Sequence, residues 1–359
     1  MTAISVQRLF NQQIAESKFS AADEIVGWMG AMQAQDYPMA KWAIGLRLQD
    51  SKDQLIEAAI NRGDILRTHI LRPTWHFVSA DDIYWLLELT APHIFSSLKF
   101  RHKFLEISDD ILKKSNKLIE KALSTGSHLT REEIAKILAK ARIKTDLNRL
   151  SHLLLLAELA GITCSGVARG NRTTYALLPK RVPHRKVYPH DESLAKLAQR
   201  YFNSRGPARL QDFIWWSGLP AAKAKKALEL AKSNFISQTI DSEEYWFSGS
   251  IPSHQNDNTS PYFLAAFDEF LIGYKDRSAP LAGISDKKAI SNNGIFHPLL
   301  VINGQVRGTW KRTIKDDKVL IEIYLFDAHK NKIKNLKWEN AERFGYFLNK
   351  KTEIKLYRE

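Results

Sequence analysis

The chain has 359 residues, of which 44% are hydrophobic and nine are tryptophan, a composition that excludes a disordered protein and can bury a large core. Its formal net charge of +14 favours a polyanionic partner, most simply nucleic acid, although a basic surface can also serve solubility alone. The one cysteine, Cys164, excludes an internal disulfide and a zinc site built from thiolates.

No apolar run reaches membrane-spanning length, and polar residues interrupt the N-terminal segment where a signal peptide would have its apolar core. We therefore expect a cytoplasmic protein with no membrane partner, located on the nucleoid while bound to DNA. The sequence has neither the spacing of metal ligands nor a glycine-rich phosphate loop, so we predict no metal and no cofactor.

The first predicted unit spans residues 1–105 and has helices before a β-ribbon, which is the layout of a winged helix. Apolar periodicity and capping residues predict its helices. Gly63 closes the last of them, and Arg72-Pro73 separates the two strands. The predicted helices cover 5–14, 22–32, 41–47 and 52–61, and the predicted strands cover 65–71 and 74–78.

A polar motif, Gln33-Ala34-Gln35-Asp36, follows the second of these helices. Pro38 disfavours the helical region for the residue before it, so we expect Tyr37 to be extended. In an extended segment residues two apart point to the same side, so Gln33 and Gln35 would present two amides together. The alternative is a polar helix end with two solvated glutamines.

The second predicted unit spans residues 106–182 and repeats this layout. Its helices are predicted over 109–123, 132–141 and 148–160, the last in the usual position of a recognition helix. Strands at 162–167 and 173–178 would form a hairpin whose tip carries Arg169 and Arg172. This tip is either a phosphate or minor-groove contact or an ordinary solvated turn.

A third winged-helix unit is predicted over residues 190–250. Its last helix is basic and includes Lys225, which either contacts DNA or belongs to a solvated face. After a polar linker at 253–261, residues 262–359 are expected to form a small C-terminal β-rich, barrel-like domain. The predicted fold class is therefore α+β, with tandem winged-helix units before this domain. The tail strands are predicted at 263–267, 299–302, 306–313, 319–326 and 353–357, with a helix at 330–348.

Several sequence segments together resemble the winged-helix DNA glycosylase superfamily of the AlkZ and YcaQ type. The resemblance spans nearly the whole chain and keeps the order of the motifs. Arg72-Pro73-Thr74 departs from the family, which more often has glycine at the middle position. The matching segments are Gln33-Ala34-Gln35-Asp36, Arg67-Thr68-His69, Arg72-Pro73-Thr74-Trp75-His76, Arg200-Tyr201-Phe202, Gly206-Pro207, Asp212-Phe213, Trp215-Trp216-Ser217-Gly218-Leu219, Ala266-Phe267-Asp268-Glu269-Phe270-Leu271-Ile272-Gly273-Tyr274-Lys275-Asp276-Arg277 and Gly304-Gln305-Val306-Arg307-Gly308-Thr309-Trp310.

The resemblance implies a monofunctional DNA repair glycosylase that acts in base excision repair of alkylation damage. One branch of the family carries Gln-x-Gln and the other Gln-x-Asp, and Gln33-Ala34-Gln35 resembles the AlkZ branch. That branch implies excision of N7-alkylated purines and unhooking of interstrand crosslinks. The partner would be alkylated or crosslinked double-stranded DNA, bound by a monomer.

Two glutamines suffice as catalytic residues if the substrate is already a cation. An N7-alkylated purine leaves as a neutral base, so no general acid is required. What remains is to hold a water below C1′ and to stabilise positive charge on the sugar, which amide oxygens can do. We expect Gln35 to position the water and Gln33 to orient Gln35 or share that water. Asp36 would be a further stabiliser, but an extended segment points it to the opposite side.

Other residues are weaker candidates, for DNA binding. Several basic residues could contact phosphates or be surface ion-pair partners, and the histidines of the β-ribbon could contact DNA or be buried. Trp42 and Trp75 could stack on a base or pack in the core. A winged-helix DNA-binding transcriptional regulator without catalysis remains the alternative function. The remaining predicted DNA-binding residues are Arg47, Arg67, Arg72, His76, Lys275 and Arg277.

Overall fold

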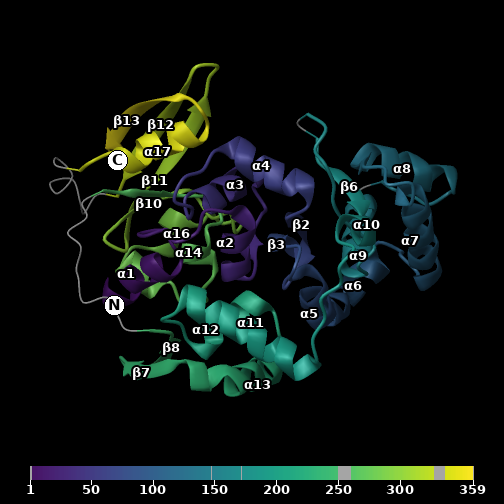
Figure 1. Ribbon diagram of the computed structural model, residues 1–359, viewed down its shortest axis with the longest axis horizontal. Helices are drawn as coiled ribbons and strands as arrows, with labels where there is room; N and C mark the ends of the chain where they lie inside the picture. The colour runs from purple at the N-terminus through teal and green to yellow at the C-terminus, as the bar shows by residue number, and fades with distance from the viewer. Residues whose placement is uncertain (1, 147, 171, 250–259, 327–335, 359) are drawn as a thin grey trace.

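The first element group contains the polar motif between a helix and a sheet. The computed structural model describes residues 2–146, 148–170, 172–249, 260–326 and 336–358 (Figure 1). This group contains helices α1 (Thr2–Asn11), α2 (Ala22–Met29), α3 (Tyr37–Gly45) and α4 (Asp53–Arg62) and a sheet in the order β1-β3-β2, on which α2 and α4 pack. Its strands are β1 (Met32–Gln33), β2 (Ile65–Ile70) and β3 (Thr74–Ser79).

The chain around the motif differs in two places from the prediction. Helix α2 ends at Met29, earlier than predicted, because Gly30 has φ 73° and turns the chain towards β3. Tyr37 was expected to be extended but begins helix α3, with Pro38 in its first turn. Proline is tolerated there because the N–H it lacks has no partner within the helix.

The second element group repeats helices followed by a small sheet. It contains α7 (Asp109–Leu123), α8 (Arg131–Lys140), α9 (Arg149–Leu159) and a sheet ordered β4-β6-β5. Thr130 and Glu133 have the sequence spacing that predicts a capping box, and it is present, since each side chain accepts the other residue's backbone N–H. The strands are β4 (Leu129–Thr130), β5 (Thr163–Ser165) and β6 (Thr174–Leu177), with the short helix α10 (Leu178–Arg181) after them.

Helix α9, predicted to occupy the recognition position, is buried along its length. Leu153 and Leu154 pack in one hydrophobic cluster, while Leu155, Leu156 and Leu159 pack in another. A helix that is buried along its length cannot present a face to a DNA groove, so the expectation of a recognition helix here is corrected. Two helices join this group to the first, α5 (Ile83–Ser97) and α6 (Lys99–Phe104).

The third element group follows the predicted order and lies below the others in Figure 1. Helix α11 (His190–Arg205) packs on α13 (Ala221–Ala231), with α12 (Leu210–Ser217) between them in the chain. The hairpin of β7 (Ile236–Ile240) and β8 (Glu243–Phe247) closes the group after the short 3-10 helix η1 (Lys232–Asn234).

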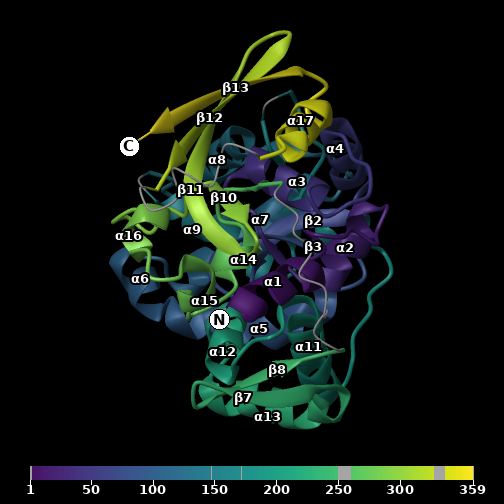
Figure 2. The same ribbon diagram turned by 90° about the vertical axis from the view of Figure 1, so that its left-hand side faces the viewer.

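The tail forms a twisted sheet in the order β13-β12-β11-β10-β9. Within the described part of the chain β9 and β13 lie at opposite edges, so the sheet is open where a barrel-like domain was expected. The hairpin of β11 and β12 extends past its neighbours at the top of Figure 2. The tail elements are β9 (Tyr262–Leu264), α14 (Glu269–Ile272), α15 (Ser278–Leu281), α16 (Asp286–Ala289), β10 (Leu299–Ile302), β11 (Gln305–Ile314), β12 (Lys318–Leu325), α17 (Glu339–Phe347) and β13 (Lys351–Arg358). The predicted start of the last helix, at 330–335, lies outside the described residues.

Two hydrophobic cores cross the predicted units. One core joins side chains of α2, α3 and α4 to the tail sheet, and the other joins α5 and β2 to α11, α12 and α13. Ala31 belongs to the second core, whereas Met32 and Ala34 belong to the first. The glutamine motif therefore lies where the two cores meet, on a backbone that is packed from both sides.

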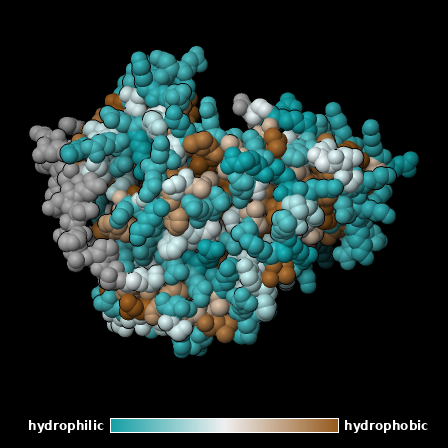
Figure 3. Space-filling model, viewed as in Figure 1, coloured by the Kyte–Doolittle hydropathy of each residue, from teal (hydrophilic) through white to brown (hydrophobic). Residues whose placement is uncertain are grey.

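The surface seen in Figure 3 is mostly hydrophilic, and a notch at its upper edge separates the tail sheet from the second element group. Every helix in the described part of the chain is too short or too polar to cross a membrane.

Candidate active site

Gln33 and Gln35 differ in their environments. Gln33 lies in β1 opposite His76 and is 5% exposed, and its amide oxygen accepts a hydrogen bond of 3.4 Å from the Thr74 hydroxyl. The ladder continues to Ala34, whose N–H donates to the Trp75 carbonyl, and then stops. Gln35 follows in a bend and is exposed to solvent. One amide is thus held by the sheet, and the other is accessible to a substrate or water.

The backbone of the motif is fixed by a buried ion pair. Glu269 Oε1 accepts the Gln33 N–H at 2.8 Å, and Oε2 accepts from Arg205 Nη2 at 2.7 Å and from Trp216 Nε1 at 3.2 Å. Arg205 also donates to the carbonyls of Met29 and Ala31. Arg205 therefore binds carbonyl groups of the segment that leads into β1, and Glu269 binds the N–H of Gln33. These contacts limit the positions that Gln33 can adopt.

A second buried pair stands beside the first. Arg47 is fully buried, with Nη2 2.7 Å from Asp268 Oδ1 and Nη1 3.0 Å from Asp268 Oδ2. Nη1 also donates to the Ala43 carbonyl, and Nη2 also donates to the Gln12 amide oxygen. A guanidinium in this position has no surface for a phosphate, so the prediction that Arg47 contacts DNA is corrected: this residue ties α3 to the tail. Asp268-Glu269, which belongs to one of the family segments, supplies the carboxylates of both buried pairs.

Asp36 is the N-cap of helix α3. Its Oδ1 accepts the Met39 N–H at 3.1 Å, and Arg312 of β11 lies 3.9 Å from the same oxygen. A carboxylate at a helix N-terminus is stabilised in its charged form by the helix dipole. Asp36 therefore has a structural role beside Gln35.

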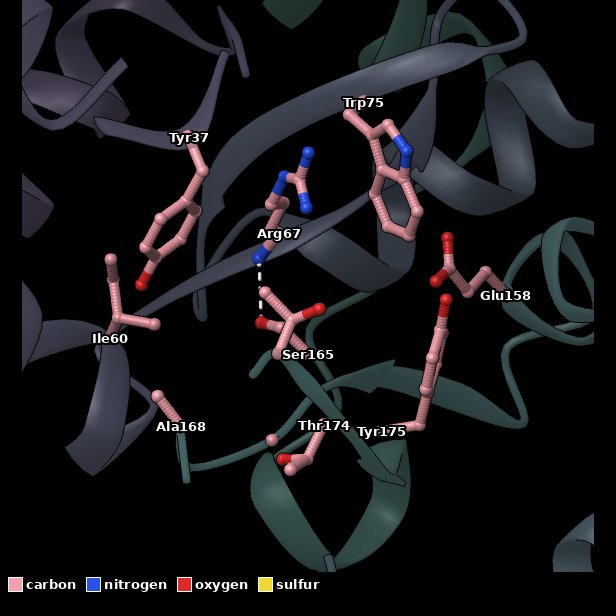
Figure 4. A pocket seen from close by; sticks show the side chains of 11 residues that line it. Tyr37, Ile60, Arg67, Trp75, Glu158, Ser165, Ala168, Thr174 and Tyr175 are labelled. Carbon is pink, nitrogen blue, oxygen red and sulfur yellow. Dashed lines mark hydrogen bonds between the residues drawn. The ribbon is translucent and has the colours of Figure 1, made fainter. Parts of the chain in front are cut away.

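Arg67 lies against the backbone of Ala34 and Gln35. Its Nε donates to the Ala34 carbonyl at 2.9 Å and its Nη2 lies 3.5 Å from the Gln35 carbonyl. The guanidinium is 4.3 Å from the ring centre of Trp75 and 5.6 Å from that of Tyr37, and Figure 4 shows it between these two rings. Burial lowers the pKa of Arg67, because the charged form loses hydration.

The two histidines of the β-ribbon are buried. His69 Nδ1 lies 2.6 Å from Glu158 Oε2. His76 is fully buried, with Nδ1 2.9 Å from the Thr74 carbonyl oxygen, and burial, aided by the charge of Arg72, lowers its pKa to about 3. His76 is therefore a neutral core residue, and the prediction that it contacts DNA is corrected.

Comparison with protein families gives a match over most of the chain. Residues 26–344 match the family described as DNA glycosylase AlkZ-like. The chain belongs to the AlkZ-like DNA glycosylase family. The solved structure of DNA glycosylase AlkZ from Streptomyces sahachiroi has the same fold, with a TM-score of 0.82 over 99% of each chain at 18% sequence identity. Comparison with curated proteins gives no match.

Family membership settles the choice between the two functions that the sequence left open. The protein is a DNA glycosylase with a winged-helix fold, and it is therefore a DNA-binding hydrolase of DNA repair. The alternative hypothesis of a regulator without catalysis is wrong. The described residues contain no cluster of three or more His, Cys, Asp or Glu side chains that could hold a metal ion.

Other basic residues of this AlkZ-like glycosylase lie nearer the surface. Arg72 and Arg277 both have their guanidinium groups 5.4 Å from the ring centre of Trp215, and burial lowers the pKa of each arginine. Trp215 is itself partly exposed. Lys275 is exposed, and its backbone N–H donates to Asp212 Oδ1 at 3.0 Å. Arg72, Arg277 and Trp215 form one cationic and aromatic cluster from three distant segments.

The hairpin arginines of the second group have different surroundings. Arg169 pairs with Glu133 at 2.8 Å and also donates to the His128 carbonyl, so part of its charge is neutralised within the protein. Arg172 is exposed. Lys225 is exposed on α13. Arg172 and Lys225 are accessible to a phosphate as they stand, whereas Arg169 would have to leave Glu133.

Trp42 and Cys164 both lie in the hydrophobic core. Trp42 is fully buried and its indole N–H donates to the Phe263 carbonyl at 2.7 Å. Cys164 is fully buried, and burial raises the pKa of its thiol to about 12, which excludes a reactive thiolate at neutral pH.

Sequence reasoning missed the residues that hold the motif in the AlkZ-like fold. Arg205 was not singled out, and Glu269 was interpreted only as part of a structural turn. The sequence signal that could have found them is the pair of acidic residues Asp268-Glu269, which lies within the strongly apolar segment Phe263–Ile272. A carboxylate buried in such a segment needs a buried partner. The sequence could indicate that such partners exist, but not that they are Arg47 and Arg205.

Proposed function

We propose that this DNA glycosylase hydrolyses the N-glycosidic bond of cationic N7-alkylated purines in double-stranded DNA. The supporting observation is an exposed amide, Gln35, beside a buried one, Gln33, on a backbone fixed by Glu269. Neither amide can act as a general acid or as a nucleophile at neutral pH. The reaction must therefore begin from a base that already carries positive charge and departs neutral.

Each glutamine has a separate role in this proposal. Gln35 positions the attacking water below C1′, because its side chain is exposed to solvent. Gln33 orients Gln35 or shares the water from its buried position, where the Thr74 hydroxyl donates to its amide oxygen. Amide dipoles held in place can stabilise charge that develops on the sugar without reorganising. Asp36 adds negative charge nearby while it caps α3.

Crosslink unhooking follows from the same chemistry. An interstrand crosslink through N7 atoms leaves each joined purine cationic, so its glycosidic bond is weakened in the same way as that of a simple adduct. We propose that the protein unhooks such crosslinks and acts as a monomer, since one chain carries the motif and the basic surface together.

Release of the free base tests this function directly. We expect the protein incubated with methylated duplex DNA to liberate N7-methylguanine, detected by chromatography, and to leave abasic sites. An unmethylated duplex is the matched control and should release nothing. Absence of free base from every methylated, bulkier alkylated and crosslinked duplex would contradict the proposed substrate class.

DNA binding is proposed to use the basic residues that remain accessible. Exposed charges gain affinity by releasing counterions from the phosphates, so each contact contributes to the salt dependence. The proposed DNA-binding residues are Arg67, Arg72, Arg169, Arg172, Lys225, Lys275 and Arg277.

Replacing Arg172 by alanine should weaken duplex binding and lower the slope of log affinity against log salt by about one, because one phosphate contact is lost. Titration of a labelled duplex at several salt concentrations measures both. Arg185→Ala is the matched control, since Arg185 is paired with Glu88 on the surface and has no proposed DNA contact. Equal slopes for wild type and Arg172→Ala would remove Arg172 from the contact surface.

A further inference from the structure

A pocket adjoins the glutamine motif on the side of Arg67. It lies between the first sheet and the second, where β2 and β3 face β5 and β6. Aromatic residues form much of its wall, and Figure 4 shows Tyr37, Trp75 and Tyr175 around it with the carboxylate of Glu158 between Trp75 and Tyr175. Neither the predicted catalytic pair nor the proposed DNA contacts other than Arg67 line this pocket, so its chemistry needs its own explanation.

Glu158 is a fully buried carboxylate with one oxygen available. Oε2 accepts the His69 backbone N–H at 2.9 Å and lies 2.6 Å from His69 Nδ1. Oε1 is buried and has no hydrogen-bond partner in the described part of the chain. Leaving a buried carboxylate oxygen without a donor is unfavourable by more than the loss of a neutral hydrogen bond. This oxygen is therefore matched to a donor that arrives from outside.

The walls beside Glu158 favour a positively charged donor. Aromatic faces attract cations, and Arg67 already uses this property by lying over Trp75 and near Tyr37. Its Nε is committed to the Ala34 carbonyl, and no hydrogen bond joins it to Glu158. Arg67 thus leaves Glu158 Oε1 without a hydrogen bond while it connects the pocket wall to the backbone of the motif.

We propose that this pocket binds a positively charged group carried on the N7 substituent of the alkylated purine, with Glu158 Oε1 as its acceptor and Trp75 and Tyr175 as its aromatic walls. The proposal rests on the proposed excision of N7-alkylated purines. It makes Glu158 a specificity-determining residue that acts on the substituent, whereas the glutamines act at the sugar. Substrates whose substituent ends in an ammonium group are then preferred over neutral ones of equal size.

Two duplexes with matched adducts test the preference. One carries N7-(aminopropyl)guanine and the other N7-(hydroxypropyl)guanine at the same position, and kcat/KM for base release is measured for each. We expect the wild type to prefer the aminopropyl adduct by about ten-fold or more, as for a hydrogen bond between charged groups. Glu158→Gln should lose most of this preference, which is read as the ratio of the two kcat/KM values, so a uniform change in rate does not affect the result.

Two further variants complete the experiment. Glu88→Gln makes the same substitution at an exposed carboxylate and should keep the preference. Trp75→Leu removes one aromatic wall of the pocket and should reduce the preference for the aminopropyl adduct about three-fold or more. This variant tests the pocket proposal if Glu158→Gln does not fold. A wild type that releases N7-methylguanine and both adducts without preference overturns the pocket proposal alone. A wild type that releases none of the three bases overturns the proposed function.

Discussion

Replacing Gln35 by alanine should lower the rate of base release by about a hundred-fold or more, while binding to duplex DNA persists. The magnitude is that of removing one preorganised polar group from a reaction centre. Binding should persist because the basic residues proposed to contact DNA lie on other segments, and because alanine keeps the Gln35 backbone carbonyl that Arg67 approaches while it truncates an exposed side chain. Single-turnover release of N7-methylguanine measures the rate, and titration of an unmodified duplex measures binding.

The control for this variant is Gln238→Ala, which truncates another exposed glutamine, on β7 far from the motif in the sequence. It should release base at the wild-type rate. If Gln35→Ala also excised N7-methylguanine at that rate, the water would have to be positioned by another group and the proposed role of Gln35 would fail.

Replacing Glu269 by alanine should reduce the free energy of unfolding by about 3–5 kcal/mol, the usual effect of removing one partner of a buried ion pair. Arg205 would remain fully buried without its carboxylate, and the Gln33 and Trp216 N–H groups would lose their acceptor. Denaturant unfolding, followed by tryptophan fluorescence, measures the change. Activity should fall in the folded fraction as well, because the motif loses the contact that fixes its backbone.

Glu88→Ala provides the comparison for Glu269→Ala. Glu88 pairs with Arg185 at the surface, where an ion pair contributes about 1 kcal/mol or less. Both substitutions replace glutamate by alanine, so the difference between their unfolding free energies measures the effect of burying the ion pair. An unfolding free energy for Glu269→Ala within 1 kcal/mol of that for Glu88→Ala, with an unchanged excision rate, would show that the buried pair does not hold the motif.

Local patterns in the sequence predicted much of the secondary structure. The capping box at Thr130, the glycine end of α4 at Gly63 and the hairpin turn at Asn303-Gly304 are decided by neighbouring residues, and all three are present. Tyr37 shows the limit of such rules: the residue before a proline is usually extended, but here Asp36 caps a helix that begins at Tyr37 and includes Pro38.

Residue roles that depend on distant partners were less predictable. Arg47 and His76 are residue types that can contact DNA. The ion pair with Asp268 places Arg47 inside the protein, and the pairing of β3 with β1 does the same for His76. The motif itself was recognised by its family pattern, whereas Glu158 was not recognised at all. A lone glutamate in the apolar run of α9 looks like a helix residue until the fold brings β2 and Trp75 against it.

The contact between Gln33 and Glu269 joins residues separated by 236 positions in the chain. During synthesis the glutamines therefore leave the ribosome long before the residue that fixes them has been made. The core that packs α2, α3 and α4 also includes side chains of the tail sheet, so the segment with Gln33 cannot take its final position until the tail has been translated. Because the glutamines proposed to be catalytic are not yet fixed in an unfinished chain, we expect such a chain to release no base from DNA.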